Sequence, residues 1–398
     1  MGKERLYFID NTRGIASIFG VFFHVGLMLN THATNLESTI DFTYYVRYFN
    51  IVRMPIFLFI SGYFVYYSLK RYQLKHFLVK RFERIGIPLF FGFVLLLPLN
   101  TFLKNLLISL KTGVFEWHYT DFLIGFKWDQ VWFLLHILLF SLIVAFTGYT
   151  VRKYPKLALI INRVFYFIFN HIIYAVVLFS LLIIIWRKFG YLAEGLAGGF
   201  FLRDILLFHN MLNNFGIFLL GAFAYKFSHD FLINIISGKR NHILILSGIY
   251  IVSVALDLSI EFDIKAFTTQ LILISLLLLI FNLAKAYLNF TNRFFRYIAE
   301  ASYPFYLLHF PMSLLFVYIY YATGISSGFI FADYIVLCIF TTLSTYFFYS
   351  FFINSNLVGR LIISGILPEK KTALNESPTR TSSLQKPLNI SDQKQGYG

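Results

Sequence analysis

Long apolar stretches alternate with short polar ones along most of the chain. Windows of roughly 20 mostly apolar residues, the length that crosses a bilayer as a helix, recur from the N-terminus almost to residue 353. They cover residues 11–31, 47–68, 85–108, 131–149, 172–188, 206–227, 242–258, 266–287, 302–322 and 330–353. The pattern predicts an all-α, polytopic transmembrane bundle of about ten spans.

Two segments break this pattern. Glycines interrupt residues 192–203, which we expect to form a loop or a re-entrant stretch rather than a span. After Pro368 the chain is rich in Ser, Thr, Gln, Lys and Asn, and such a composition buries too little apolar surface to fold. We therefore expect a membrane domain over 1–356 and a polar, largely disordered cytoplasmic tail over 357–398.

Charge sets the expected orientation. The formal net charge of +15 suggests nucleic acid at first, but Lys and Arg gather in the loops after every second span. Residues 32–46, on the opposite side, contain neither. This is the positive-inside pattern, so we expect both termini in the cytoplasm, membrane lipids as surroundings and no nucleic-acid partner. The single cysteine, Cys338, excludes an internal disulfide and a Cys-based zinc site, and we expect no metal.

An arginine and a histidine lie inside the first span. Arg13 costs at least ~2.5 kcal/mol there on insertion scales, so by default it faces the bundle interior or a wet cavity. Eleven residues bring Arg13 and His24 to nearly the same helix face, roughly 16 Å apart, with Ser17 and Gly20 between them. Such small residues leave room for a slender group. Alternatively, Arg13 snorkels to the headgroups and His24 is a neutral hydrogen-bonding residue.

Further arginines stand in and beside the next two spans. Arg53, two residues before Pro55, is unusual inside a span. Arg81 and Arg84, at i and i+3, share a helix face and are able to grip one phosphate between them. Their charge is equally explained by the positive-inside rule.

Aromatic and histidine residues mark two other spans. Trp132 begins the fourth span and is either a site-lining residue or a member of the interfacial aromatic belt. Tyr306 and His309 are i, i+3 neighbours in the ninth span. They either line the site or form a structural hydrogen bond with each other, and the hydrogen bond is the simpler interpretation. No Gly-rich phosphate loop, His-Glu-x-x-His or Gly-x-Ser-x-Gly motif occurs.

Together these motifs resemble the integral-membrane acyltransferase family 3. Its signatures are an arginine and a histidine with ten residues between them in the first span, matched by Arg13 and His24, and an Arg-x-x-Arg near the third, matched by Arg81 and Arg84. Asp10 fits the first motif as well, although Asp is also an ordinary N-cap. Within the family, the chain looks most like the branch that attaches succinyl groups to osmoregulated periplasmic glucans. The resemblance runs from residue 7 to about 311.

The resemblance implies a multi-pass protein of the bacterial inner membrane with a cytoplasmic acyl-CoA donor, an extracytoplasmic glycan acceptor and His24 as the essential catalytic residue. We expect no tightly bound cofactor, and succinyl-CoA rather than acetyl-CoA as the donor. In this hypothesis Arg81, Arg84 and Arg13 hold the donor phosphates, and the pantetheine arm follows Ser17 and Gly20. His24 then takes the proton of the glycan hydroxyl.

A second class of function fits the same residues. A transporter or flippase of an anionic or lipid-linked glycan also needs intramembrane Arg and His, with His24 in a proton relay. Transfer of an acyl group from acyl-CoA by the purified protein separates the two.

Overall fold

A computed structural model describes residues 6–32, 42–123, 127–151, 154–197, 208–228, 231–259 and 265–365. These residues are helical apart from short connections, and no strand occurs among them. The helices of the first half are α1 (Tyr7–His32), α2 (Phe42–Arg71), α3 (Leu74–Arg81), η1 (Phe82–Gly86), α4 (Ile87–Phe91), η2 (Gly92–Leu96), α5 (Leu97–Thr112), η3 (Tyr119–Leu123), η4 (Asp129–Val131), α6 (Trp132–Val151), α7 (Pro155–Asn170) and α8 (Ile172–Ala197). Those of the second half are α9 (Phe208–Lys226), η6 (Phe231–Ile235), α11 (Arg240–Ser259), α12 (Lys265–Tyr287), α13 (Arg293–Thr323), α14 (Ile330–Phe348), η7 (Tyr349–Asn354), α15 (Leu357–Gly359) and η8 (Arg360–Ser364).

Nine helical stretches of the described chain are long and apolar enough to cross a membrane. They correspond to nine of the ten spans expected from the sequence, and the protein is therefore a multi-pass membrane protein. The exception is α9, which is a helix but is not apolar enough to count as a span. Three asparagines at its start, Asn210, Asn213 and Asn214, lower its hydropathy.

The helix α9 is nevertheless at the centre of the bundle, because it packs closely along α2. A Cβ atom placed on Gly62 of α2 would lie 1.9 Å from the Phe218 carbonyl oxygen, and one on Gly221 of α9 would lie 1.9 Å from the Phe59 carbonyl oxygen. The two glycines thus let the backbones approach, as small residues do between membrane helices.

Three segments differ from the expected pattern of loops. The helix α8 continues to Ala197, so residues 192–197 are helical and not a loop, and residues 198–207 lie outside the described part. The amphipathic helix α7 was not predicted. Helical turns at 357–364 carry the buried Ile363 into the packed unit, while 366–398 lie outside the described residues. The domain boundary after residue 356 stays a prediction.

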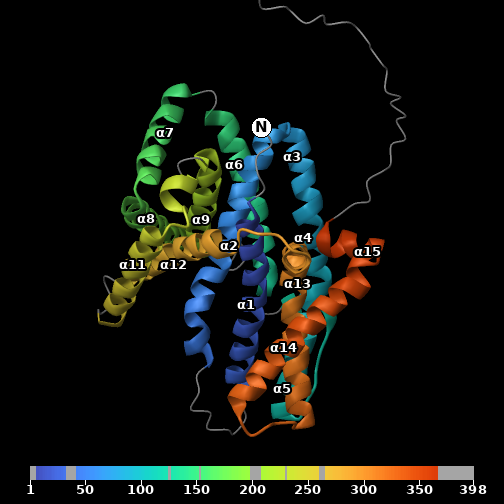
Figure 1. The fold of residues 1–398 in the computed structure, drawn as a ribbon. Helices are drawn as coiled ribbons and strands as arrows, with labels where there is room; N and C mark the ends of the chain where they lie inside the picture. The colour runs from blue at the N-terminus through green and yellow to red at the C-terminus, as the bar shows by residue number, and fades with distance from the viewer. Residues whose placement is uncertain are drawn as a thin grey trace, which may run out of the picture. The chain divides into compact units, whose positions relative to one another are not determined.

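The helices that carry the candidate residues pack against one another. Figure 1 shows α1, in dark blue, between α2 and the orange α13, and α1 contacts both as well as α14. The helix α13 also packs on α5. Large apolar side chains on the outer faces are exposed, among them Phe340, Leu343 and Phe347 of α14. Such faces are unfavourable in water and suit contact with lipid tails.

Candidate active site

Two imidazoles meet where α1 crosses α13. The ring centroids of His24 and His309 lie 5.2 Å apart, and the Phe310 ring packs edge-on against His24 at 4.8 Å. His309 is fully buried, and its Nδ1 lies 2.7 Å from the Tyr306 carbonyl oxygen and 3.2 Å from that of Phe305. Because only a protonated Nδ1 donates to a carbonyl, the lone pair of neutral His309 is on Nε2.

Arg53 of α2 reaches the same place. A Cβ atom on Gly20 would lie 2.9 Å from His309 Nε2 and 3.0 Å from Arg53 Nη1, so these side chains converge on the glycine of α1. His24 follows Gly20 by one helical turn, and helical side chains lean back over the preceding turn. The Arg53 guanidinium also lies over the Phe23 ring, 5.2 Å from its centroid. Gly20 therefore makes room for the arginine and histidine side chains next to His24.

Several polar atoms of this group of side chains make no hydrogen bond. His24 Nδ1, His309 Nε2 and Arg53 Nε and Nη1 are buried and have no hydrogen-bond partner among the described residues. Buried polar groups are nearly always paired, and exceptions are frequent at sites that bind or transform a ligand. Two imidazoles and a guanidinium with buried, unbonded nitrogens supply a proton acceptor and strong donors for a negatively charged group. We call His24, His309 and Arg53 the histidine–arginine cluster.

Arg13 is tied into the bundle at the other end of the strip. Its Nη2 donates to the Ala299 carbonyl oxygen of α13 at 2.8 Å and lies 3.6 Å from an Asp10 carboxylate oxygen. Arg13 is therefore bonded to the neighbouring helix rather than only to headgroups, and Asp10 is its local counter-ion.

The strip between Arg13 and His24 is closed rather than open. A Cβ on Gly14 would meet Ile298 at 2.8 Å, the buried Ser17 hydroxyl donates to the Gly14 carbonyl at 2.6 Å, and Gly20 faces His309. The small residues thus serve close packing between α1 and α13. Side chains of other helices lie close to Gly14 and Gly20 in this structure, and the donor path along Ser17 and Gly20 stays a prediction.

Arg81 and Arg84 stand at the junction of α3 and the π-helical turn η1. The guanidinium of the partly buried Arg81 lies 5.3 Å from the Phe77 ring centroid, whereas Arg84 is exposed. The end of the η8 segment packs on this turn, since a Cβ on Gly365 would lie 2.2 Å from the Glu83 carbonyl oxygen. The described structure does not join the two arginines to the histidine–arginine cluster by any direct contact.

A network of polar side chains next to the histidine–arginine cluster was not predicted from the sequence. Tyr306 donates its hydroxyl to the Gln130 carbonyl oxygen at 2.6 Å, and the Gln130 side chain accepts from Asn100 at 3.0 Å. Asn100 also donates to Asp129, whose carboxylate binds Lys104 Nζ at 2.6 and 2.8 Å. The sequence did contain a signal for this network, because Asn100 and Lys104 stand inside the third apolar span. Polar residues inside a span usually have a functional or structural role.

Proline explains one link of this network. Pro311 has no N–H, so the Leu307 carbonyl one turn earlier lacks its helical partner. Gln130 Nε2 donates to that carbonyl at 3.1 Å. The Tyr306 hydroxyl bonds the backbone of η4, whereas the Tyr306 carbonyl oxygen accepts from His309 Nδ1. Trp132, at the start of α6, packs on His136 with ring centroids 5.1 Å apart.

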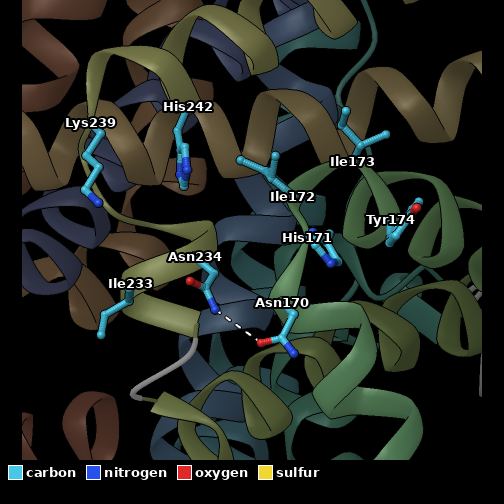
Figure 2. Close-up of a pocket in the computed structure, with 9 residues that line it drawn as sticks. All are labelled: Asn170, His171, Ile172, Ile173, Tyr174, Ile233, Asn234, Lys239 and His242. Atoms are coloured by element: carbon cyan, nitrogen blue, oxygen red, sulfur yellow. Dashed lines mark hydrogen bonds between the residues drawn. The ribbon is translucent and has the colours of Figure 1, made fainter.

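A separate cavity of about 410 Å³ lies where α7, α8, η6 and α11 meet (Figure 2). Its lining includes His171, Lys239 and His242, and Asn234 donates to Asn170 at 3.3 Å across it. None of the residues expected from the sequence to form the site lines this cavity. It is therefore distinct from the histidine–arginine cluster.

Comparison with known proteins gives one family and a set of relatives. The sequence profile of an acyltransferase domain, that of the acyltransferase 3 family, matches residues 6–350. Glucans biosynthesis protein C of Escherichia coli (strain K12) is 24% identical over 329 residues, which cover 79% of this chain and 83% of that protein. The Shigella dysenteriae serotype 1 protein of the same name is 24% identical over 326 residues, with the same coverage.

A shorter stretch is more similar. Glucans biosynthesis protein C of Salmonella typhi is 38% identical over 88 residues, which are 21% of this chain and 23% of that protein. No solved structure matches the chain.

Proposed function

The chain belongs to the acyltransferase 3 family, and from this premise we propose that it moves an acyl group from cytoplasmic acyl-CoA across the bacterial inner membrane to a hydroxyl of a periplasmic or cell-envelope glycan. The observation that carries the proposal is the histidine–arginine cluster. Its unpaired imidazole nitrogens lie inside a membrane-spanning bundle, beside a guanidinium whose Nε and Nη1 have no hydrogen-bond partner among the described residues. Acyl transfer to a hydroxyl needs such a base in a site from which water is excluded.

His24 is the general base of this reaction. The glycan hydroxyl oxygen attacks the thioester carbonyl carbon while an imidazole nitrogen of His24 accepts its proton. The C–S bond then breaks, and the proton passes from the imidazolium to the departing CoA sulfur. His309 adjoins His24, and its Nδ1 is held by backbone carbonyls, which fixes its ring. A direct transfer of this kind requires no acyl-enzyme intermediate.

The donor's phosphates bind at the arginines of the cytoplasmic side. Arg81 and Arg84 stand three residues apart at the η1 turn, and guanidinium groups bind phosphate in fork geometry. Arg13, at the end of α1 that we expect on the cytoplasmic side, is proposed as a third residue that binds the donor phosphates. The thioester reaches His24 along the face of α1 that carries Ser17 and Gly20, which requires the Arg53 and His309 side chains beside Gly20 to move when the donor binds.

The acceptor is proposed from the relatives. Proteins called glucans biosynthesis protein C match most of the chain, which favours a glucan as the acceptor. The succinyl cargo is the part of the proposal that follows from the resemblance of the sequence motifs. The site residues support the chemistry, whereas the identity of the glycan rests on these names.

Acyl transfer by purified protein tests the base. With radiolabelled succinyl-CoA and a glucan oligosaccharide, the wild-type protein should transfer label, and His24→Ala should lower the rate by roughly 10²-fold or more. Binding of succinyl-CoA to His24→Ala should remain. Full transfer by this variant would contradict the base assignment, and vectorial glycan uptake into vesicles without acyl-CoA consumption would identify a transporter instead.

Donor binding tests the arginines. Arg81→Ala should raise the Kd for acyl-CoA by about tenfold or more, because a charged hydrogen bond to phosphate contributes ~1.5–3 kcal/mol. Arg71→Ala is the matched control, since this exposed arginine at the end of α2 bonds only to the neighbouring Tyr67 hydroxyl. If the Arg81→Ala variant and the wild type bind the donor with equal affinity, Arg81 does not bind the donor, and the positive-inside rule alone explains its position.

A further inference from the structure

Arg53 carries a permanent charge that no described residue balances. Its side chain is 7% exposed, and its Nε and Nη1 have no hydrogen-bond partner. It forms no ion pair with any residue in the described part of the chain, and its guanidinium lies over the face of the Phe23 ring. A buried, unpaired charge costs several kcal/mol, so this arrangement is expected where a ligand supplies the counter-ion.

The neighbouring cation does not share this feature. Lys104, which also lies within electrostatic range of His24, is paired with the Asp129 carboxylate at 2.6 Å. His24 and His309 are neutral when they act as lone-pair acceptors. The histidine–arginine cluster therefore has one excess positive charge, located on Arg53, and one bound anion would neutralise it.

The helix geometry of α1 sets the spacing along the helix between the Arg53 guanidinium and His24. Arg53 Nη1 lies at the level of Gly20, and His24 follows one helical turn later along α1, about 6 Å for four residues. The two carboxyl carbons of a four-carbon diacid are separated by three C–C bonds of ~1.5 Å, or roughly 4 Å when extended. An acyl group of this length reaches from the reacting carbon beside His24 to the guanidinium.

We propose that Arg53 binds the far carboxylate of the acyl group, so that the site selects a short ω-carboxyacyl donor over an uncharged acyl donor of equal length. The inference rests on the proposed acyl transfer and adds the residue that recognises the acyl group. A guanidinium matches a carboxylate with two parallel N–H donors, and Arg53 has unused N–H groups for this.

The competing role for Arg53 is stabilisation of the oxyanion at the reacting carbon. That charge exists only in the transition state and would leave the arginine without a counter-ion in the donor complex. A carboxylate on the cargo balances Arg53 from the moment the donor binds. The two roles also differ in measurable consequence, since an oxyanion donor serves every acyl group alike.

Matched donors separate these roles. Purified full-length protein should be assayed with succinyl-CoA and butyryl-CoA, which have acyl chains of equal length and differ in the terminal carboxylate. The wild type should prefer succinyl-CoA in kcat/KM. Arg53→Met should lower the succinyl-to-butyryl ratio by about 100-fold or more, as expected when one partner of a buried charge pair is removed. Arg53→Lys, which keeps the charge, should restore part of the ratio.

Arg81→Met is the control, because a residue that binds the shared phosphates lowers both donors in parallel and leaves the ratio unchanged. A wild type that shows no preference for succinyl-CoA would overturn the inference without any variant. An equal fall for both donors in Arg53→Met would overturn it as well and assign Arg53 to the reacting oxygen. Absence of transfer from either donor in the wild type would refute the proposed function itself.

Discussion

At the residue scale, the site depends on a glycine as much as on the charged groups. Gly20 has no side chain, and His309 Nε2 and Arg53 Nη1 occupy the space where a Cβ would stand. The sequence interpretation saw a small residue on the face between Arg13 and His24 and took the space for a ligand path. Sequence does not show which distant side chain fills a gap, so the role of Gly20 was visible only in the folded chain.

Gly20→Ala should therefore impair activity more than folding. The added methyl would displace Arg53 or His309 by a few tenths of an ångström or more, and we expect a loss of roughly tenfold or more in the transfer rate, since small misplacements of catalytic groups are costly. The rate should be compared with that of Gly248→Ala, whose Cβ meets nothing within 4 Å. Normal activity of Gly20→Ala would show that the convergence on this glycine is unimportant.

At the element scale, polar and small residues decide how the helices lock together. The helices α2 and α9 touch backbone to backbone at Gly62 and Gly221, and α13 is bonded through its proline-freed carbonyl to Gln130. The glycine contact and this hydrogen bond determine how the helices pack. Apolar side chains alone give little specificity inside a membrane, because lipid tails contact a helix as favourably as they do.

Gly62→Ala should destabilise the protein strongly. The new methyl would lie 1.9 Å from the Phe218 carbonyl oxygen, and a backbone atom of a packed helix has nowhere to move. Overpacking typically costs ~1–3 kcal/mol, so we expect a lower melting temperature in detergent. Gly216→Ala on α9 meets only the flexible Ile183 side chain at 3.2 Å and should melt close to the wild type. An unchanged melting temperature for Gly62→Ala would contradict the close contact between α2 and α9.

Gln130→Leu tests the hydrogen bonds behind the cluster. It leaves the Leu307 carbonyl without its donor and the Asn100 amide with only Asp129 of its two acceptors, which should cost ~1–3 kcal/mol of unfolding free energy. The exposed Gln73→Leu, just before α3, is the reference variant and should be nearly neutral. Equal thermal stability of the two variants would mean that water or another group satisfies the Leu307 carbonyl.

At the scale of the whole molecule, the sequence predicted the helices well and their partners poorly. Nine of the expected spans are present because roughly 20 consecutive apolar residues have few other stable forms. The helix α9 is less apolar than a span because its core position tolerates asparagines such as Asn214, which bonds His136 at 3.3 Å. His24 and His309 were each singled out, yet their contact across most of the chain has no local sequence signal.

Orientation follows from charge and is open to direct measurement. The natural Cys338 is buried, so single cysteines introduced elsewhere report on their own surroundings. Val114→Cys, in the exposed connection after α5, should react with an impermeant maleimide from the periplasmic side, and Lys239→Cys should react only from the cytoplasm. Labelling of both from one side would show that α9 does not cross the membrane, and would contradict the ten-span arrangement that places both termini in the cytoplasm.

The central claim is that His24 performs acyl transfer to an envelope glycan, and mass spectrometry of these glycans tests it most directly. Glycans should be compared from cells that contain the wild-type gene, no gene or the His24→Ala variant at equal membrane abundance. We predict a succinyl mass increment in the wild-type cells and its loss in both others. A succinyl increment that persists in cells with His24→Ala alone would contradict the account.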